Sequence, residues 1–157
     1  MAERYHGPRA EVPMIRGSCL CGGVAYEIDG RVSPIQLCHA RRCRKMSASA
    51  FRAEAAVKAD ALRFVRGEEL ITVYEAPILR EPPAFRSRFC KVCGTPLPGE
   101  LEGTGFAVVF PSAFDGEPEL TAFRHIFVSQ NARWLPIADD LPQFAERPPE
   151  SERLPRR

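Results

Sequence analysis

Four of the six cysteines form two tight pairs, Cys19-Leu20-Cys21 and Cys90-Lys91-Val92-Cys93, which lie far apart in the chain. Four thiolates arranged as two pairs suit a tetrahedral zinc ion that links distant segments. Glycine follows each pair, at Gly22 and Gly94, where it permits the positive φ of a backbone turning around a metal. The spacing therefore predicts a structural zinc site made of Cys19, Cys21, Cys90 and Cys93. Its alternative is four unlinked, buried cysteines.

The third cysteine group is Cys38-His39-Ala40-Arg41-Arg42-Cys43-Arg44-Lys45, which combines two thiols, one imidazole and four cations. Nearby cations lower the pKa of a thiol and attract an anionic substrate. We therefore predict that Cys38 and Cys43 are catalytic and that Arg41, Arg44 and Lys45 bind a small-molecule thiol. The alternatives are a pair of inert thiols and a solvated basic face. Because successive side chains of a strand point to opposite faces, Cys38 and His39 are not expected to share a metal.

Composition limits the class of protein. A chain of 157 residues is long enough for one domain with a core. It has no apolar run of membrane-spanning length, and its charged start, Met1 to His6, differs from a signal peptide. We therefore expect a cytoplasmic protein whose cysteines serve metal binding or chemistry rather than disulfides. A net charge of +2 does not favour nucleic-acid binding, and the sequence carries no signal for oligomeric state.

Short apolar or alternating runs predict a mainly β fold. The 15 prolines disfavour long helices and suit short strands joined by loops. We expect a flexible arm at 1–12, a single zinc-containing domain at 13–146 and a disordered tail at 147–157. The expected strands cover residues 23–30, 35–38, 51–57, 61–65, 70–74, 84–89, 105–110 and 125–128.

Four motifs, in order, carry a family resemblance. They are Gly17-Ser18-Cys19-Leu20-Cys21-Gly22-Gly23-Val24-Ala25-Tyr26, Cys38-His39-x-x-x-Cys43-Arg44-Lys45, Arg88-Phe89-Cys90-Lys91-Val92-Cys93-Gly94-Thr95, and His125-Ile126-Phe127-Val128 with Trp134 and Asp140-Leu141-Pro142. With them, residues 15–145 resemble the glutathione-dependent formaldehyde-activating enzyme family, which includes centromere protein V. The resemblance implies two or more antiparallel sheets in a β-tent arrangement, held by a structural zinc at the two outer cysteine pairs.

The same resemblance implies an activity. Members join formaldehyde to the thiol of glutathione, or cleave the adduct as carbon–sulfur lyases, at a second zinc bound by a Cys-His-Cys-x-x-Cys group. In this chain the middle cysteine of that group is Ala40, and the glycine that usually follows is Ala48. Cys38 and Cys43 remain, so we predict one zinc per chain. Two functions stay open: a lyase of this type with an altered catalytic motif, and a zinc-stapled binding module whose active site has decayed.

Overall fold

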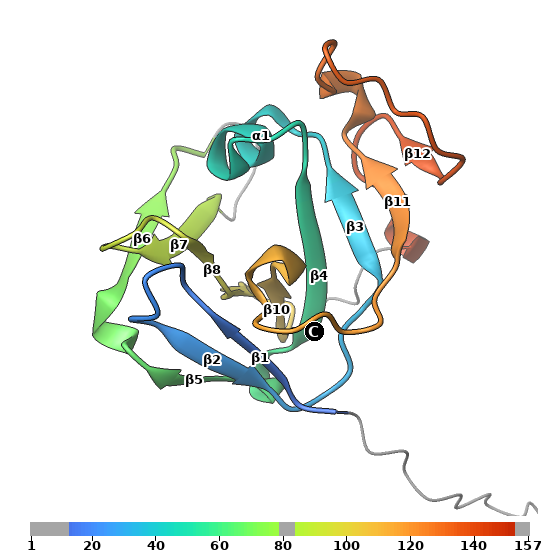
Figure 1. Ribbon diagram of the computed structural model, residues 1–157. Helices are drawn as coiled ribbons and strands as arrows, with labels where there is room; N and C mark the ends of the chain where they lie inside the picture. Colours follow the sequence, from blue (N-terminus) through green and yellow to red (C-terminus); the bar gives the residue numbers. More distant parts are fainter. Residues whose placement is uncertain (1–12, 79–83, 153–157) are drawn as a thin grey trace, which may run out of the picture.

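The computed structural model describes residues 13–78 and 84–152 (Figure 1). The predicted arm at 1–12 lies outside these residues. Of the segment predicted as a tail, residues 147–152 are described and include the 3-10 helix Glu150–Glu152. In the described part of the chain, no helix is long and apolar enough to cross a membrane.

The described residues form three sheets, so the predicted mainly β fold is confirmed. Two of them are antiparallel and have three strands each. The first contains β1 (Ile15–Ser18), β2 (Ala25–Ile28) and β5 (Leu62–Arg66). The second contains β6 (Ile71–Glu75), β7 (Arg86–Cys90) and β8 (Pro96–Leu97).

The third sheet has six strands in the order β12-β11-β3-β4-β10-β9. These are β12 (Gln143–Phe144), β11 (Ala122–Ile126), β3 (Ile35–Cys38), β4 (Arg52–Lys58), β10 (Phe106–Val109) and β9 (Gly99–Leu101). Strand β11 runs parallel to both β3 and β12, whereas the other neighbours are antiparallel. The two three-stranded sheets confirm the expectation of two or more antiparallel sheets, and the third sheet is mixed.

Helical turns connect the strands. The α-helix in the described residues, α1 (Arg41–Ser47), joins β3 to β4. The 3-10 helices are Ala59–Ala61, Glu68–Leu70, Pro111–Ala113, Val128–Gln130 and Glu150–Glu152. Helix α1 was not among the expected elements, because its run of arginine, cysteine and lysine has no apolar periodicity of its own. Helix α1 follows the end of β3 (Figure 1), and Sγ of Cys43 lies 3.1 Å from Sγ of Cys38 at that end.

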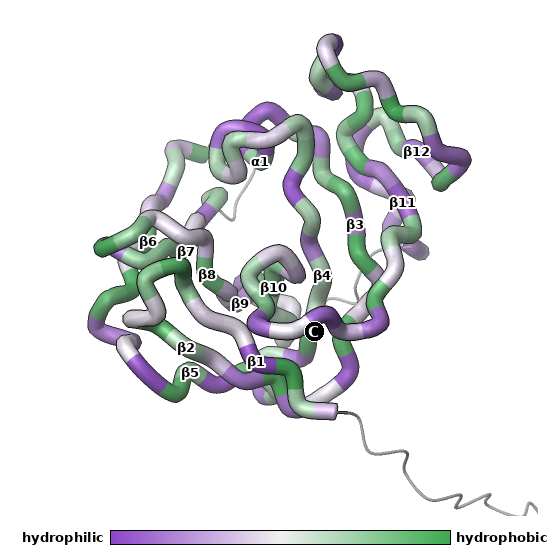
Figure 2. Tube along the Cα trace, in the orientation of Figure 1, coloured by the Kyte–Doolittle hydropathy of each residue, from purple (hydrophilic) through white to green (hydrophobic). Residues whose placement is uncertain are grey.

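Buried side chains form two separate clusters. The main core lies between the sheets and includes Cys19 and Cys90 beside Tyr26, Leu97 and Val109. A smaller cluster lies beneath α1 and consists of Cys38, Ala40, Cys43 and Ile126. Hydrophobic residues continue along β3, while α1 carries mostly hydrophilic residues (Figure 2). The two groups of cysteines thus belong to different packing units.

Candidate functional site

The outer cysteine pairs lie on two similar tight turns. Cys19 follows β1, and Cys90 ends β7. In the first turn the Gly22 amide donates to the carbonyl of Cys19 (2.8 Å), and in the second the Gly94 amide donates to that of Cys90 (2.8 Å). Both glycines have positive φ, 71° and 76°, as expected for a backbone that wraps around a metal.

The four sulfurs of these turns come together. One ligand atom from each of Cys19, Cys21, Cys90 and Cys93 lies within 4.8 Å of all the others. The Sγ atoms of Cys19 and Cys21 are 3.5 Å apart, and those of Cys21 and Cys90 are 3.8 Å apart. A tetrahedron with zinc–sulfur bonds of about 2.3 Å has edges of about 3.8 Å. The donor set and its spacing therefore fit a zinc ion.

Electrostatics also favours a cation among these sulfurs. A hydrogen bond from the Gly23 backbone lowers the pKa of Cys21, but the neighbouring sulfurs, Cys19 foremost, raise it to about 11. Thiolates crowded together disfavour each other's ionisation unless a positive charge lies between them. The Thr95 hydroxyl, 3.3 Å from Sγ of Cys93, holds the pKa of that thiol at about 5. The cluster could hold a metal ion as thiolates.

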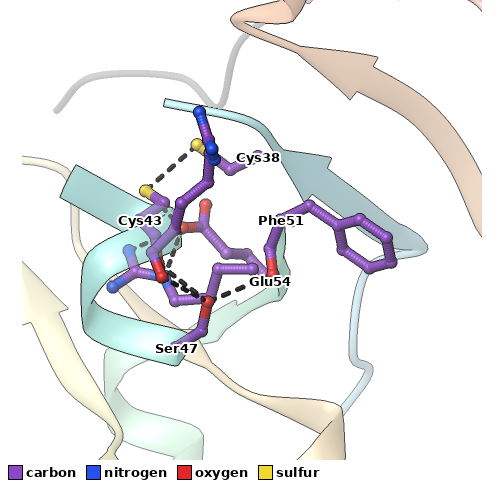
Figure 3. Close-up of polar contacts among 7 residues, drawn as sticks. Cys38, Cys43, Ser47, Phe51 and Glu54 are labelled. Carbon is purple, nitrogen blue, oxygen red and sulfur yellow. Dashed lines mark hydrogen bonds and ion pairs between the residues drawn. The ribbon is translucent and has the colours of Figure 1, made fainter. Parts of the chain in front are cut away.

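Cys38 and Cys43 form a second sulfur site. Cys38 ends β3 and Cys43 lies on the inner side of α1; their Sγ atoms face each other at 3.1 Å (Figure 3). The Cys38 thiol donates to Sγ of Cys43, and the Cys43 thiol in turn donates to Oε1 of Glu54. The contact with Cys43 lowers the pKa of Cys38, although burial opposes this. The same bond, with burial, raises the pKa of Cys43. The two thiols therefore differ in pKa, and the pKa of Cys38 is the lower one.

Glu54 and Arg52, both on β4, complete the surroundings of this pair and were missed in the sequence. Oε1 of Glu54 lies 3.6 Å from Sγ of Cys43 (Figure 3). It also accepts hydrogen bonds from Nε and Nη2 of Arg52, at 2.8 and 2.6 Å. Because Cys38 pairs with Arg52 in the sheet, knowing that β3 and β4 are neighbours would have located both residues. Cys38, Cys43 and Glu54 form a second group that could hold a metal ion.

His39 turns away from the sulfurs and forms a chain with His125 and Asp139. Nε2 of His39 is 2.8 Å from Nδ1 of His125, and Nε2 of His125 is 3.0 Å from the carboxylate of Asp139. Since the carboxylate accepts, His125 donates from Nε2 and accepts at Nδ1 from His39. Nδ1 of His39 is then a buried acceptor without a partner among the described residues.

The hydrogen-bonded series His39, His125 and Asp139 joins three segments near the smaller buried cluster. His39 follows β3, His125 is on β11, and Asp139 precedes the turn to β12. Burial, followed by the charges of His125 and Arg44, lowers the pKa of His39. The backbone amide of Leu141 and then His125 lower the pKa of Asp139. The carboxylate that contacts His125 therefore belongs to Asp139, the residue just before the sequence motif Asp140-Leu141-Pro142.

The predicted substrate-binding cations lie on the outer side of α1. Arg41, Arg44 and Lys45 line a surface hollow together with Ala48, Ser49 and Trp134. Trp134 is 69% exposed, so it belongs to this surface rather than to the core. Nη1 of Arg44 donates to the carbonyl of Gln130 (2.9 Å), while its Nε is buried without a partner in the described part of the chain. The hollow offers positive charge to an anion.

Two alanines mark where the chain departs from the family pattern. Ala40 is buried beside Cys38 and Cys43 and supplies no ligand atom. Ala48 ends α1 in a left-handed conformation, with φ 49° and ψ 38°. Glycine is the usual residue at such a helix end because it has no Cβ to clash. Ala48 therefore adopts a backbone conformation that favours glycine.

Fold and site together define a β protein with two cysteine groups, one joining two turns and one beneath a short helix. The family model of the glutathione-dependent formaldehyde-activating enzyme matches residues 14–130, and the chain belongs to this family. A crystal structure of a Rhodobacter sphaeroides protein has the same fold, with a TM-score of 0.52 and 22% sequence identity. That similarity covers 68% of this chain and 98% of the other. No curated protein sequence matches the chain.

Proposed function

We propose that the protein is a carbon–sulfur lyase that acts on a thiol adduct of formaldehyde, such as S-hydroxymethylglutathione. The observation that carries this proposal is the pair of buried sulfurs of Cys38 and Cys43, which lie 3.1 Å apart. Membership of the family supplies the class of reaction at the level of glutathione-related formaldehyde activation. The cations of the outer hollow suit the two carboxylates of glutathione.

Side chains of this protein can carry out the proton transfers and the substrate binding that the reaction needs. Cys38 is buried, so the reaction requires a movement of α1 that admits the adduct. The Cys38 thiolate then accepts the proton of the adduct's hydroxyl group. The electrons of the breaking carbon–sulfur bond pass to the substrate sulfur while a carbonyl bond forms. The substrate sulfur takes the proton back from Cys38, and formaldehyde and the free thiol leave. Arg41, Arg44 and Lys45 bind the anionic part of the thiol and orient it.

A zinc ion at Cys19, Cys21, Cys90 and Cys93 is the cofactor that we propose. It would join the β1–β2 turn to the β7–β8 turn and thereby stabilise the main core, without taking part in the reaction. At the second group, two hydrogen bonds from Arg52 already engage Oε1 of Glu54. This supports a single zinc per chain.

Exchange spectroscopy tests the lyase proposal. Carbon-13 formaldehyde and glutathione equilibrate with their adduct in solution, and NMR measures the exchange rate with and without protein. We expect the protein to accelerate exchange and Cys38→Ser to abolish the acceleration. Arg44→Ala should weaken glutathione binding, whereas Arg31→Ala, a change at a cation outside the hollow, serves as the matched control. Exchange at the uncatalysed rate with intact protein would refute the proposal.

A binding module is the second candidate, and one observation favours it. Cys38 and Cys43 are only 3% and 2% exposed, while the cations lie on the opposite side of α1. A ligand in the hollow would therefore not reach the sulfurs in this conformation. Calorimetry with glutathione separates the two candidates: binding that Arg44→Ala weakens, together with no acceleration of exchange, identifies a binding module.

A further inference from the structure

We propose that Cys38 and Cys43 form a redox-active dithiol that small hydroperoxides oxidise to a disulfide, with Glu54 as the proton acceptor for Cys43. This activity goes beyond the proposed lyase function. It uses the same sulfur pair but requires neither glutathione nor formaldehyde. It rests on the arrangement of three side chains from β3, α1 and β4.

The two sulfurs are already close enough to react with each other. Their separation of 3.1 Å is less than the sum of two sulfur radii, about 3.6 Å, so only a small movement separates this pair from bonding distance. Cys38 lies where a strand ends and Cys43 lies within a short helix, so side-chain rotation can bring them together. No change in the sheet is needed.

Each sulfur has the surroundings of a different role. Sγ of Cys38 lies 3.1 Å from Sγ of Cys43, and this contact lowers the pKa of Cys38, which favours a nucleophilic thiolate. Cys43 carries the proton and has the Glu54 carboxylate 3.6 Å away, so it can lose that proton when it attacks. A thiolate that reacts first and a thiol with a base beside it are what sequential disulfide formation requires.

Burial selects the size of the oxidant. Both sulfurs are almost fully buried, and the side chains of Ile126 and Ala40 pack against them. Hydrogen peroxide is close to water in size, whereas glutathione disulfide is far too large to reach a sulfur enclosed in this way. The substrate class is therefore a small hydroperoxide.

The reaction balances with one peroxide. The Cys38 thiolate attacks a peroxide oxygen; a sulfur–oxygen bond forms, the oxygen–oxygen bond breaks, and the leaving hydroxide takes a proton from solvent. Cys43 passes its proton to Glu54 and attacks the Cys38 sulfenic acid. A sulfur–sulfur bond forms, and the departing hydroxide recovers the proton as water. Two electrons pass from the sulfurs to one hydrogen peroxide, which yields two waters.

Mass spectrometry of the full zinc-loaded protein tests this proposal without any lyase assay. Stoichiometric hydrogen peroxide should produce a Cys38–Cys43 disulfide, seen as a loss of two hydrogens and in a peptide map, at unchanged zinc content. Glu54→Gln should slow disulfide formation about 100-fold, the size of a lost general base. Glu119→Gln, a change at an exposed carboxylate outside the site, should leave the rate unaltered.

A cysteine variant and the sites of oxidation provide further tests of the redox proposal. Cys43→Ser should accumulate a sulfenic acid at Cys38 that dimedone traps. Oxidation that begins at Cys19, Cys21, Cys90 or Cys93, or that drives Cys38 to sulfinic acid without a disulfide, would overturn it. So would a second metal ion that shields Cys38 and Cys43. Formaldehyde exchange is measured on protein that has not been treated with peroxide. A failure of the lyase proposal can therefore be distinguished from a failure of the redox proposal.

Discussion

The outer cysteine group (Cys19, Cys21, Cys90 and Cys93) and the inner group (Cys38 and Cys43) place their thiols in different surroundings. In the outer group, four sulfurs from two glycine-bearing turns are spaced for one ion, and two of these cysteines are part of the main core. In the inner group, two sulfurs face each other directly, and a carboxylate and a guanidinium occupy the surroundings. We propose that these differences in the number, spacing and surroundings of the sulfurs separate a metal site from a dithiol.

The largest expected difference lies in folding. Cys90→Ser should unfold the protein or make it aggregate, because a structural zinc contributes on the order of 10 kcal/mol of apparent binding energy in small zinc domains. Cys38→Ser, the matched change in the inner group, should leave the fold and the zinc content intact. Circular dichroism and elemental analysis measure both. A folded, zinc-bound Cys90→Ser protein would contradict the proposed staple.

A third thiol should make the inner cysteine group bind zinc, as we propose for the outer group. Ala40 is buried against both inner sulfurs, so Ala40→Cys adds a third thiol to the same cluster. We expect the zinc content to rise from one toward two per chain. Ala50→Cys introduces a thiol at another buried alanine and serves as the control. Unchanged occupancy in Ala40→Cys would show that the site, and not one ligand, has been lost.

The sequence predicted the outer group more completely than the inner one. Glycines beside each cysteine pair indicate the turns directly, and most predicted strands lie close to observed ones, for example 35–38 at β3. Glu54 and His125 were not predictable as neighbours of the 38–43 segment. Their proximity depends on which strands pair with β3, and alternation within one strand does not show its neighbours. Helix α1 formed through tertiary packing of Cys43 rather than through a local pattern.

The inner side of the protein should also be the more sensitive to pH. Burial lowers the pKa of His39, so the unfolded chain takes up a proton more readily than the folded one. The free energy of unfolding should therefore decrease as the pH falls below about 6.5, the ordinary histidine value. Urea denaturation between pH 5 and 7.5 measures it. His39→Gln should flatten this dependence, and an equally steep slope in that variant would rule out His39 as its source.

The smallest expected effect is at the end of α1. Ala48 has φ 49°, a conformation that costs an L-residue about 1–2 kcal/mol. Ala48→Gly should raise the free energy of unfolding by about 1 kcal/mol, or Tm by about 3 °C. Ala53→Gly, within strand β4, should instead lower it by about 0.5–1 kcal/mol. Equal losses in the two variants would contradict the strain assigned to Ala48.

Zinc stoichiometry tests the contrast between the two groups most directly. Protein purified without added metal is analysed for zinc per chain, and anomalous scattering from a crystal identifies the ligands. We predict one zinc ion, bound by Cys19, Cys21, Cys90 and Cys93, with Cys38 and Cys43 free of metal. Two zinc ions per chain, or a single ion bound by Cys38, Cys43 and Glu54, would contradict the contrast.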